Sequence, residues 1–565
     1  LSLGAGYTKS GGNLLSSSAT LDLLVDLAIT SDSALSFNQL NLNNLTLTLG
    51  SESSDLQVSS ALILDNSNER VMTGAADFVS LGSLDISDGG VISTGGTINF
   101  SGGGQLSGTG KLDVSGSTWG LGEDFVKSSG TLTISQTDLK LVDNSTLTSD
   151  EALSFVNLNL NDFTLTLGSS TSDLTVQNAI TLDTSTEGIS TGEADLILNS
   201  ALTMNNGLLD STGGTWEFNG DFNKTSGTLS ITETDLTLTN NITLTSDEAL
   251  SFVTLNLNDF KLTLGSSTSD LTVENAITID ASTEGILTGG ADLLLSALTL
   301  SAGDVTSTGG IVSLSGGGQL SGTGKFDVSG STTVGTEGWV LGGDFVKSSG
   351  TLTISQTDLK LDKDLTLTSD EALSFVNLNL NFNTLTLGSS TSDLTVENAI
   401  TIGQNTEGIS TGDADLILNE SQTISGQGSI TSTGGIISLQ EGGRLLGNGI
   451  LDVSGSIWTL GDNFTKTSGT LTMLQTTLKL EDNSTLTSDV SLNFENLNLN
   501  DFTLTLGSST SDLTVVDNIT IDSSGEGILT GGADLLLSAL TLSAGDVTST
   551  GGIVSLSGGG QLSGT

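Results

Sequence analysis

The sequence predicts an all-β protein, an elongated β-solenoid whose coils are each roughly 20 to 26 residues long. Three observations predict it: a strand-like alternation of apolar and polar residues, five internal units of unequal length, and the absence of proline from all 565 residues. Proline removes a hydrogen-bond donor from a β ladder. A chain that pairs strand on strand along its whole length therefore has reason to exclude it.

The strand signal comes from short runs in which Leu, Ile or Val alternate with Thr, Ser or Asn, as in residues 131–134, 163–167 and 173–176. Alternation with period two is typical of a half-buried strand, with the aliphatic residues inward. The 73 glycines fall mostly in short clusters such as 102–104, where tight corners need positive φ. We expect two or three strands per coil, of either handedness.

The unit lengths come from one Thr-Ser series, whose successive spacings are 118, 97, 123 and 119 residues; its members are Thr30, Thr148, Thr245, Thr368 and Thr487. A globular domain cannot lose a block of roughly 20 to 26 residues without refolding, whereas a stack of coils can lose one turn. We therefore expect about four coils in the short unit and five in the long ones. The prediction is one continuous solenoid over 1–565, with repeats at approximately 1–118, 119–215, 216–338, 339–457 and 458–565, the last incomplete. We expect the chain to be a piece of a longer array.

Composition excludes several classes of function. The formal charge of −51 repels phosphate, so nucleic acid is not an expected partner. Without histidine or cysteine the chain lacks the commonest bases, nucleophiles and transition-metal ligands, and we predict that it is not an enzyme and has no cofactor other than a possible calcium ion. No run approaches 18 apolar residues, so no transmembrane helix is expected.

The alternating runs, the Gly-Gly corners, the Asn-Leu-Asn-Leu-Asn stretch at 157–161 and the lack of Cys and Pro resemble the repetitive β-helical regions of giant secreted bacterial exoproteins. These include filamentous-haemagglutinin-like adhesins and autotransporter passengers. The resemblance implies an extracellular or cell-surface rod that serves as a fibre subunit, sheath component or adhesin stalk and associates with itself head to tail or laterally. The alternative is an adhesin whose rod surface binds glycan or a partner protein.

Two series of acids are candidate calcium ligands or turn caps. Paired acids recur at one repeat position and could bind calcium through carboxylate oxygens: Asp150, Glu151, Asp247, Glu248, Asp370 and Glu371. The equivalents Asp32-Ser33 and Asp489-Val490 lack the second acid, which favours solvated or turn-capping acids. A second series stands alone in Ser/Thr-rich turns, where Asp usually caps its own backbone; its members are Asp55, Asp173, Asp270, Asp393 and Asp512.

One lysine position is occupied in every repeat, by Lys9, Lys127, Lys224, Lys347 and Lys466. A solvated lysine would be expected to wander among repeats. The fixed place favours an ion pair, either to an acid in a neighbouring coil or across an interface between rods.

Aromatic residues and sequons also recur. The recurring Trp and Phe positions could form a carbohydrate-stacking ladder; the tryptophans are Trp119, Trp216, Trp339 and Trp458. Coils stacked at about 4.8 Å would separate successive members by roughly 20 Å, so we expect these aromatic residues to fill or cap a wider coil of the core. Sequons could mark an exported, glycosylated protein or arise by chance in a chain rich in Asn, Ser and Thr; they start at Asn44, Asn144, Asn223, Asn241, Asn419, Asn463, Asn483 and Asn518.

Overall fold

The computed structural model describes residues 1–4, 6–11, 14, 16–329, 338–404 and 406–563. In these ranges the chain is all β with no helix, and parallel strands stack into a β-solenoid of about 26 turns. It divides into two compact units, Leu1–Glu274 and Asn275–Thr565. The all-β solenoid predicted from the alternation is thereby confirmed.

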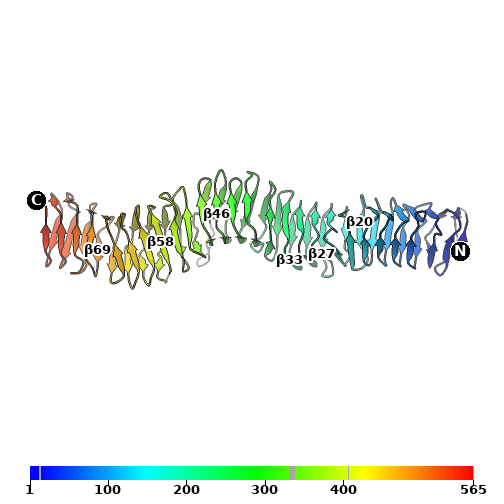
Figure 1. The fold of residues 1–565 in the computed structure, drawn as a ribbon, viewed down its shortest axis with the longest axis horizontal. Helices are drawn as coiled ribbons and strands as arrows, with labels where there is room; N and C mark the ends of the chain where they lie inside the picture. Colours follow the sequence, from blue (N-terminus) through cyan, green and yellow to red (C-terminus); the bar gives the residue numbers. More distant parts are fainter. Residues whose placement is uncertain (5, 12–13, 15, 330–337, 405, 564–565) are drawn as a thin grey trace. The chain divides into compact units, whose positions relative to one another are not determined.

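Each coil contributes three strands, such as β10 (Arg70–Gly74), β11 (Phe78–Ser80) and β12 (Leu84–Ile86). From β4 onward, strands three apart in the chain pair in parallel. One sheet of the first unit includes β4 (Leu27–Ser31), β7 (Thr46–Leu49), β10, β13 (Gly90–Ser93) and β16 (Lys111–Asp113). A second includes β5 (Leu35–Phe37), β8 (Leu56–Val58), β11 and β14 (Thr97–Phe100), and a third includes β9 (Leu62–Leu64), β12 and β15 (Gly104–Leu106). The second unit repeats this pattern, for example in the sheet that includes β53 (Leu373–Phe375), β56 (Leu394–Val396), β59 (Leu416–Leu418) and β62 (Ile436–Leu439). Figure 1 shows these strands stacked coil upon coil within each unit.

The repeat that begins at Trp119 shows the element order that the others vary. Its strands are β17 (Thr118–Leu121), β18 (Phe125–Lys127), β19 (Thr131–Thr133), β20 (Asp138–Leu141), β21 (Ser145–Ser149), β22 (Leu153–Phe155), β23 (Leu158–Asn159), β24 (Thr164–Leu167), β25 (Leu174–Val176), β26 (Ile180–Leu182), β27 (Gly188–Gly192), β28 (Leu196–Leu198), β29 (Leu202–Met204) and β30 (Leu208–Ser211).

Coils differ in length without losing their register. Leu139 lies opposite Leu158 in the next coil, whereas Thr164 lies opposite Gly188 across a longer coil. Val312 lies opposite Trp339, and the intervening coil contains residues 330–337, which are outside the described ranges. The sheets therefore tolerate coils of different length, and in the coil from Thr164 to Gly188 the extra residues lie between the strands.

Among the described strands, the repeats that begin at Trp119 and Trp339 differ in length by one whole coil, and neither is a whole number of coils. From Trp119 in β17 to Trp216 in β31 (Thr215–Phe218) the chain advances 14 strands. From Trp339 in β48 (Trp339–Leu341) to Trp458 in β65 (Ile457–Leu460) it advances 17. The difference is three strands, one coil. Since neither number divides by three, a repeat is four or five coils plus two strands, and equivalent residues of successive repeats lie in different sheets.

Aliphatic and aromatic side chains fill the interior of the coils. The four tryptophans are at most 1% exposed, and the ring of Trp119 meets that of Phe125 edge to face, with centroids 5.1 Å apart. Trp339 and Phe345 repeat the contact at 4.9 Å. No hydrogen-bond partner of the four buried indole N–H groups lies in the described ranges, so packing holds these rings. The prediction that they fill the core is confirmed.

The Asn-Leu-Asn-Leu-Asn stretch ends at a corner where its last residue and the residue after it have positive φ. In the second repeat these are Asn161 (φ 52°) and Asp162 (φ 72°), and the Asn161 amide donates to the carbonyl oxygen of Leu141 in the preceding coil at 3.3 Å. Asn and Asp tolerate this conformation better than other non-glycine residues. The exception is Phe382, which takes φ 67° at the equivalent place and is 59% exposed.

Candidate functional site

The recurring lysine lies at the last residue of its strand in all five repeats, and strand alternation turns it inward. In β18, Phe125 and Lys127 are buried and Val126 between them is exposed. The in-register neighbour of Lys127 in the preceding coil is Leu106, which follows Ile86. A column of aliphatic side chains therefore ends on a buried ammonium, which is costly without a partner.

The partner is a carboxylate from the next coil. Lys127 Nζ donates to Asp150 Oδ1 and lies 3.1 Å from Glu151 Oε1. The lysine side chain is 2% exposed and that of Asp150 45% exposed, so the acid covers the ammonium from the solvent side. We call this arrangement, with the serines described below, the lysine cluster.

The other four lysine clusters follow the same plan with one difference. Lys224 pairs with Asp247 and Glu248, and Lys347 with Asp370 and Glu371, whereas Lys9 and Lys466 each have a single carboxylate. Lys9 adds a bond to Ser33 Oγ at 2.8 Å. At Lys466 the residue after the acid is Val490, so Asp489 is its one carboxylate partner in the described ranges. The structure thus contains the first of the two ion pairs considered for this position, the pair within the chain.

A third coil holds the carboxylate in place through hydroxyl groups. The Ser149 N–H donates to Ser172 Oγ at 2.8 Å, and the Ser149 carbonyl oxygen accepts from Ser169 Oγ at 3.0 Å and Thr171 Oγ1 at 2.7 Å. Ser149 Oγ in turn accepts the N–H of Glu151 at 3.1 Å. Equivalent bonds occur in the other repeats, for example around Ser31, Ser246, Ser369 and Ser488. Each lysine cluster therefore links three successive coils.

The electrostatics favour the charged form of both partners. Burial disfavours the ammonium of Lys127, but its hydrogen bonds and Coulombic attraction to Asp150 and Glu151 outweigh burial and raise the pKa of Lys127 above the usual 10.5. The same balance raises the pKa of Lys224 and Lys347. The hydrogen bond from the lysine is the main cause that lowers the pKa of Asp32 and Asp150 below the usual 3.8.

The six acids considered as calcium ligands are the ion-pair partners of the lysines. Calcium takes six to eight oxygen ligands. Among the residues that the structure describes, no three acidic side chains come together in a way that could hold a metal ion. A calcium ion bound to Asp150 and Glu151 would have to replace the Lys127 ammonium. Calcium binding stays a prediction, in competition with the ion pair.

The second Asp series acts between coils as well as lying in turns. Asp55 Oδ1 accepts the N–H of Asp77 at 2.9 Å, and Asp173 Oδ1 accepts that of Asp195 at 3.0 Å. The series of hydrogen bonds continues into the following coil, because Asp77 Oδ1 accepts the N–H of Thr97 at 2.6 Å. We expected these acids to cap their own backbone; their partners instead lie one coil further along the chain, beyond the reach of a local turn motif.

Several sequon asparagines have the same structural role as an aspartate elsewhere. Asn144 Oδ1 accepts the N–H of Thr164 at 2.9 Å, and Asp26, one repeat earlier, accepts that of Thr46 at 2.9 Å. Asn463 and Asp124 are a second such pair, bonded to the N–H groups of Thr485 and Thr146. Since either residue supplies the acceptor, these asparagines are explained by structure, and glycosylation stays a prediction.

No protein-family model matches the chain, and neither a curated protein nor a solved structure matches it. The fold and the lysine cluster therefore carry the functional argument by themselves.

The hydrogen bonds from the hydroxyl groups of the third coil were not predicted from the sequence. A signal was present, because the Ser/Thr-Ser-Asp turn at 171–173 follows the acid pair at 150–151 by about one coil in each repeat.

In the described part of the chain, no helix is long and apolar enough to cross a membrane.

Proposed function

We propose that the protein is a structural, non-catalytic β-solenoid rod at the cell surface or outside the cell, where it serves as a fibre subunit, sheath component or adhesin stalk. The observation that carries the proposal is that the recurring lysine, serine and aspartate side chains form bonds from one coil to another. Each lysine cluster links three coils, and the hydrogen bonds from Asp77 to Asp55 and from Thr97 to Asp77 also join three successive coils. The polar residues that recur are thus used for cohesion along the stack.

The backbone supports the same function. Parallel ladders run through each compact unit, and pulling along such a stack loads many hydrogen bonds at once. The buried core is made of Leu, Ile, Val and aromatic side chains that stack coil on coil. The resemblance to β-helical exoproteins adds the expected setting, outside the cell.

The test is to locate the protein on intact cells. Antibodies against the chain should label unpermeabilised cells or shed fibres, and electron microscopy should show the label along filaments or a surface layer. Labelling that requires permeabilised cells would overturn the proposed location, and label without any filament or layer would overturn the structural role.

A further inference from the structure

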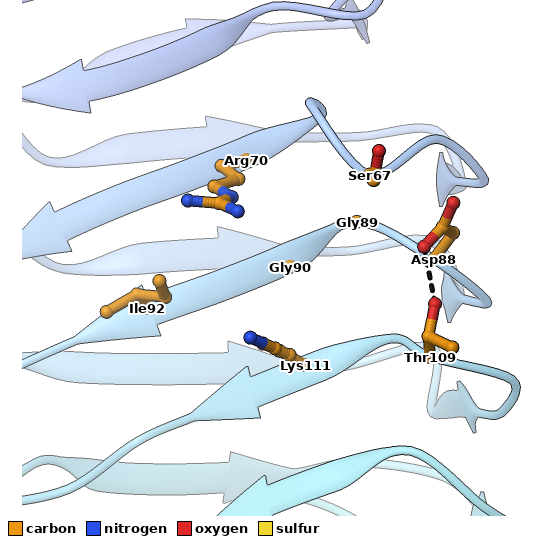
Figure 2. A pocket seen from close by; sticks show the side chains of 8 residues that line it. All are labelled: Ser67, Arg70, Asp88, Gly89, Gly90, Ile92, Thr109 and Lys111. Atoms are coloured by element: carbon orange, nitrogen blue, oxygen red, sulfur yellow. Dashed lines mark hydrogen bonds between the residues drawn. The ribbon is translucent and has the colours of Figure 1, made fainter.

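A shallow pocket opens on the outer surface of the first compact unit, next to the corner that precedes β10, β13 (Gly90–Ser93) and β16 (Lys111–Asp113) (Figure 2). Its volume is about 240 Å³. We call it the Arg70 pocket; it is lined by Ser67, Arg70, Asp88, Gly89, Gly90, Ile92, Thr109 and Lys111.

The pocket exists because a glycine separates two cations. Arg70, Gly90 and Lys111 are the first residues of three stacked strands and lie in register, Arg70 opposite Gly90 and Gly90 opposite Lys111. Strands pair about 4.8 Å apart, so the middle position would normally fill the gap with a side chain. In Figure 2 the Arg70 guanidinium and the Lys111 ammonium lie on either side of β13, and Ile92 lies farther along it.

Both cations lack an acidic partner. Among the described residues, no carboxylate forms an ion pair with Arg70 or Lys111, although the chain carries 65 acids. Asp88 lies in the pocket, where its Oδ1 accepts a hydrogen bond from Thr109 Oγ1. The pocket thus presents two cationic donors on one side and a fixed acceptor on the other.

The other repeats fill the same three places differently. In the four later repeats, the residue equivalent to Arg70 is a glycine: Gly188, Gly285, Gly408 or Gly527. Lys325 is the equivalent of Lys111, and it lies in register with Asp304 in the preceding strand. In the first repeat that aspartate is replaced by Gly90 and a second cation is added. Lys325 therefore lies beside an acid in the preceding strand, whereas Lys111 lies beside Gly90.

We propose that the Arg70 pocket binds the anionic group, carboxylate or sulfate, of an acidic sugar. Arg70 can hold such a group with two parallel N–H bonds, and Lys111 adds a point charge. Asp88 accepts hydrogen bonds from sugar hydroxyls, Ser67 can donate or accept one, and Ile92 offers an apolar contact. A pocket smaller than the roughly 300 Å³ at which drug-sized sites begin suits one sugar unit of a longer chain.

The pocket favours a sugar over an acidic side chain from a second copy for two reasons. Asp88 can accept hydrogen bonds from the hydroxyl groups of a sugar, whereas a carboxylate side chain brings no donor. A second copy would also bring its own charge of −51 toward the surface. This inference goes beyond the structural role and does not depend on it.

The experiment is calorimetric titration of the full chain with three oligosaccharides of equal length: an oligogalacturonate, a sulfated oligosaccharide and a neutral one. We expect saturable binding of at least one acidic oligosaccharide, and weaker binding as salt is raised from about 20 to about 150 mM, since screening shortens the reach of exposed charges. The neutral oligosaccharide should not bind. The two acidic arms distinguish a carboxylate from a sulfate ligand.

The variants use residues that the chain itself has at the equivalent places. Arg70→Gly copies the later repeats, and Lys111→Ile copies Ile450, the first residue of β64 (Ile450–Asp452). Each should weaken binding at least tenfold. Lys325→Ile is the matched control, because it removes a lysine from the same strand position in another repeat, and it should leave the affinity unchanged. Circular dichroism melts of the three variants report whether the fold is kept.

Three outcomes would overturn the proposal. One is no binding of either acidic oligosaccharide at millimolar concentration. Another is equal loss in Lys325→Ile, which would indicate non-specific attraction. The third is a change of self-association in Arg70→Gly without sugar binding, measured by light scattering, which would assign the cations to a second copy of the chain.

Discussion

The buried lysine shows what one residue contributes to a long repeat. A buried ion pair is often no more stabilising than an apolar pair of similar volume, but removing one partner is costly. An aliphatic column packs about equally well if it slips by a coil, whereas both carboxylates that pair with Lys127 come from the single coil that follows it. The lysine cluster therefore specifies which coil follows which.

The first prediction concerns the lysine with a single carboxylate. Asp489→Asn should leave the Lys466 ammonium buried without a counter-charge. Because the acid is 43% exposed, we expect less than the roughly 3–5 kcal/mol of a fully buried pair, about 1–3 kcal/mol. In a repeat protein the effect is local, so hydrogen exchange of peptides spanning 445–490 should measure it.

Two controls accompany this variant. Asp150→Asn should cost less, because Glu151 remains 3.1 Å from Lys127. The double change Lys466→Met with Asp489→Asn should restore most of the protection. Equal protection in the wild type and Asp489→Asn would show that the ion pair contributes nothing.

A second prediction is the pH dependence of the lysine cluster. The pKa of Asp150 is lowered in the fold, so its contribution is present above about 3.8 and is lost as the pH falls through the folded pKa. The pKa of Lys127 is raised, so its contribution is present below about 10.5 and is lost as the pH rises through the folded pKa. Tryptophan fluorescence should be flat between these limits and change outside them. Lys127→Met should make the tryptophan fluorescence of its coil less dependent on pH. A pH profile identical to that of the wild type would contradict the assignment of the transition to this ion pair.

A third prediction concerns the strained corner residue. A bulky residue in the left-handed region costs about 1–2 kcal/mol, and Phe382 gains little burial in return. Phe382→Asn, which copies Asn44 of the first repeat, should therefore slow hydrogen exchange in its coil by an amount equivalent to about 1 kcal/mol. Asp162→Phe is the reciprocal variant and should destabilise by a similar amount. If hydrogen exchange becomes slower in both variants, or faster in both, backbone strain at this corner does not explain the change in stability.

At the scale of the coil, the sequence predicted the type of element well and the partners of each element poorly. Alternation identifies which residues face inward, so the strands and the aromatic core followed from it. The alternation does not say which residues meet across coils, because the coils vary in length, as the pairs Leu139–Leu158 and Thr164–Gly188 show. This is why the carboxylate for Lys127 and the serines around Ser149 were not assigned from spacing. The two leftover strands per repeat were missed for the same reason.

The fourth prediction uses a coil that the second repeat lacks. Residues 97–117 contain three strands, β14 (Thr97–Phe100), β15 (Gly104–Leu106) and β16, and Thr97 lies opposite Thr118. Deleting them joins Gly96 to Thr118 and gives Ser-Thr-Gly-Gly-Thr-Trp, the sequence at 211–216. The shortened chain should fold with an unchanged β spectrum and a melting temperature close to that of the wild type.

The control for this deletion is the removal of 97–106 alone, which takes away part of a coil. It should break the register, because a shift of one residue turns inward side chains outward. Equal melting of the two shortened chains would contradict the three-strand coil.

At the scale of the whole molecule, charge and repeat geometry act on association in different ways. The chain has 14 basic residues against 65 acids, and five of the bases are buried in lysine clusters, so its outer surface is strongly anionic. In the described strands, the equivalent side chains of Lys9, Lys127 and Lys224 lie in three different sheets. A second molecule that packs sideways against one sheet of the described chain therefore does not find the equivalent residues of successive repeats aligned along that sheet.

The last prediction is that self-association depends on salt. At an ionic strength of about 0.01 M the Debye length is about 30 Å and the anionic surfaces repel, whereas at about 0.15 M it is about 8 Å and contacts can form. Light scattering should therefore give a monomer at low salt and larger species at moderate salt. Raising the osmolality with sucrose instead should have no such effect, because sucrose does not screen charge. A stable monomer at high protein concentration in both salts would contradict the fibre subunit and leave the stalk as the structural role.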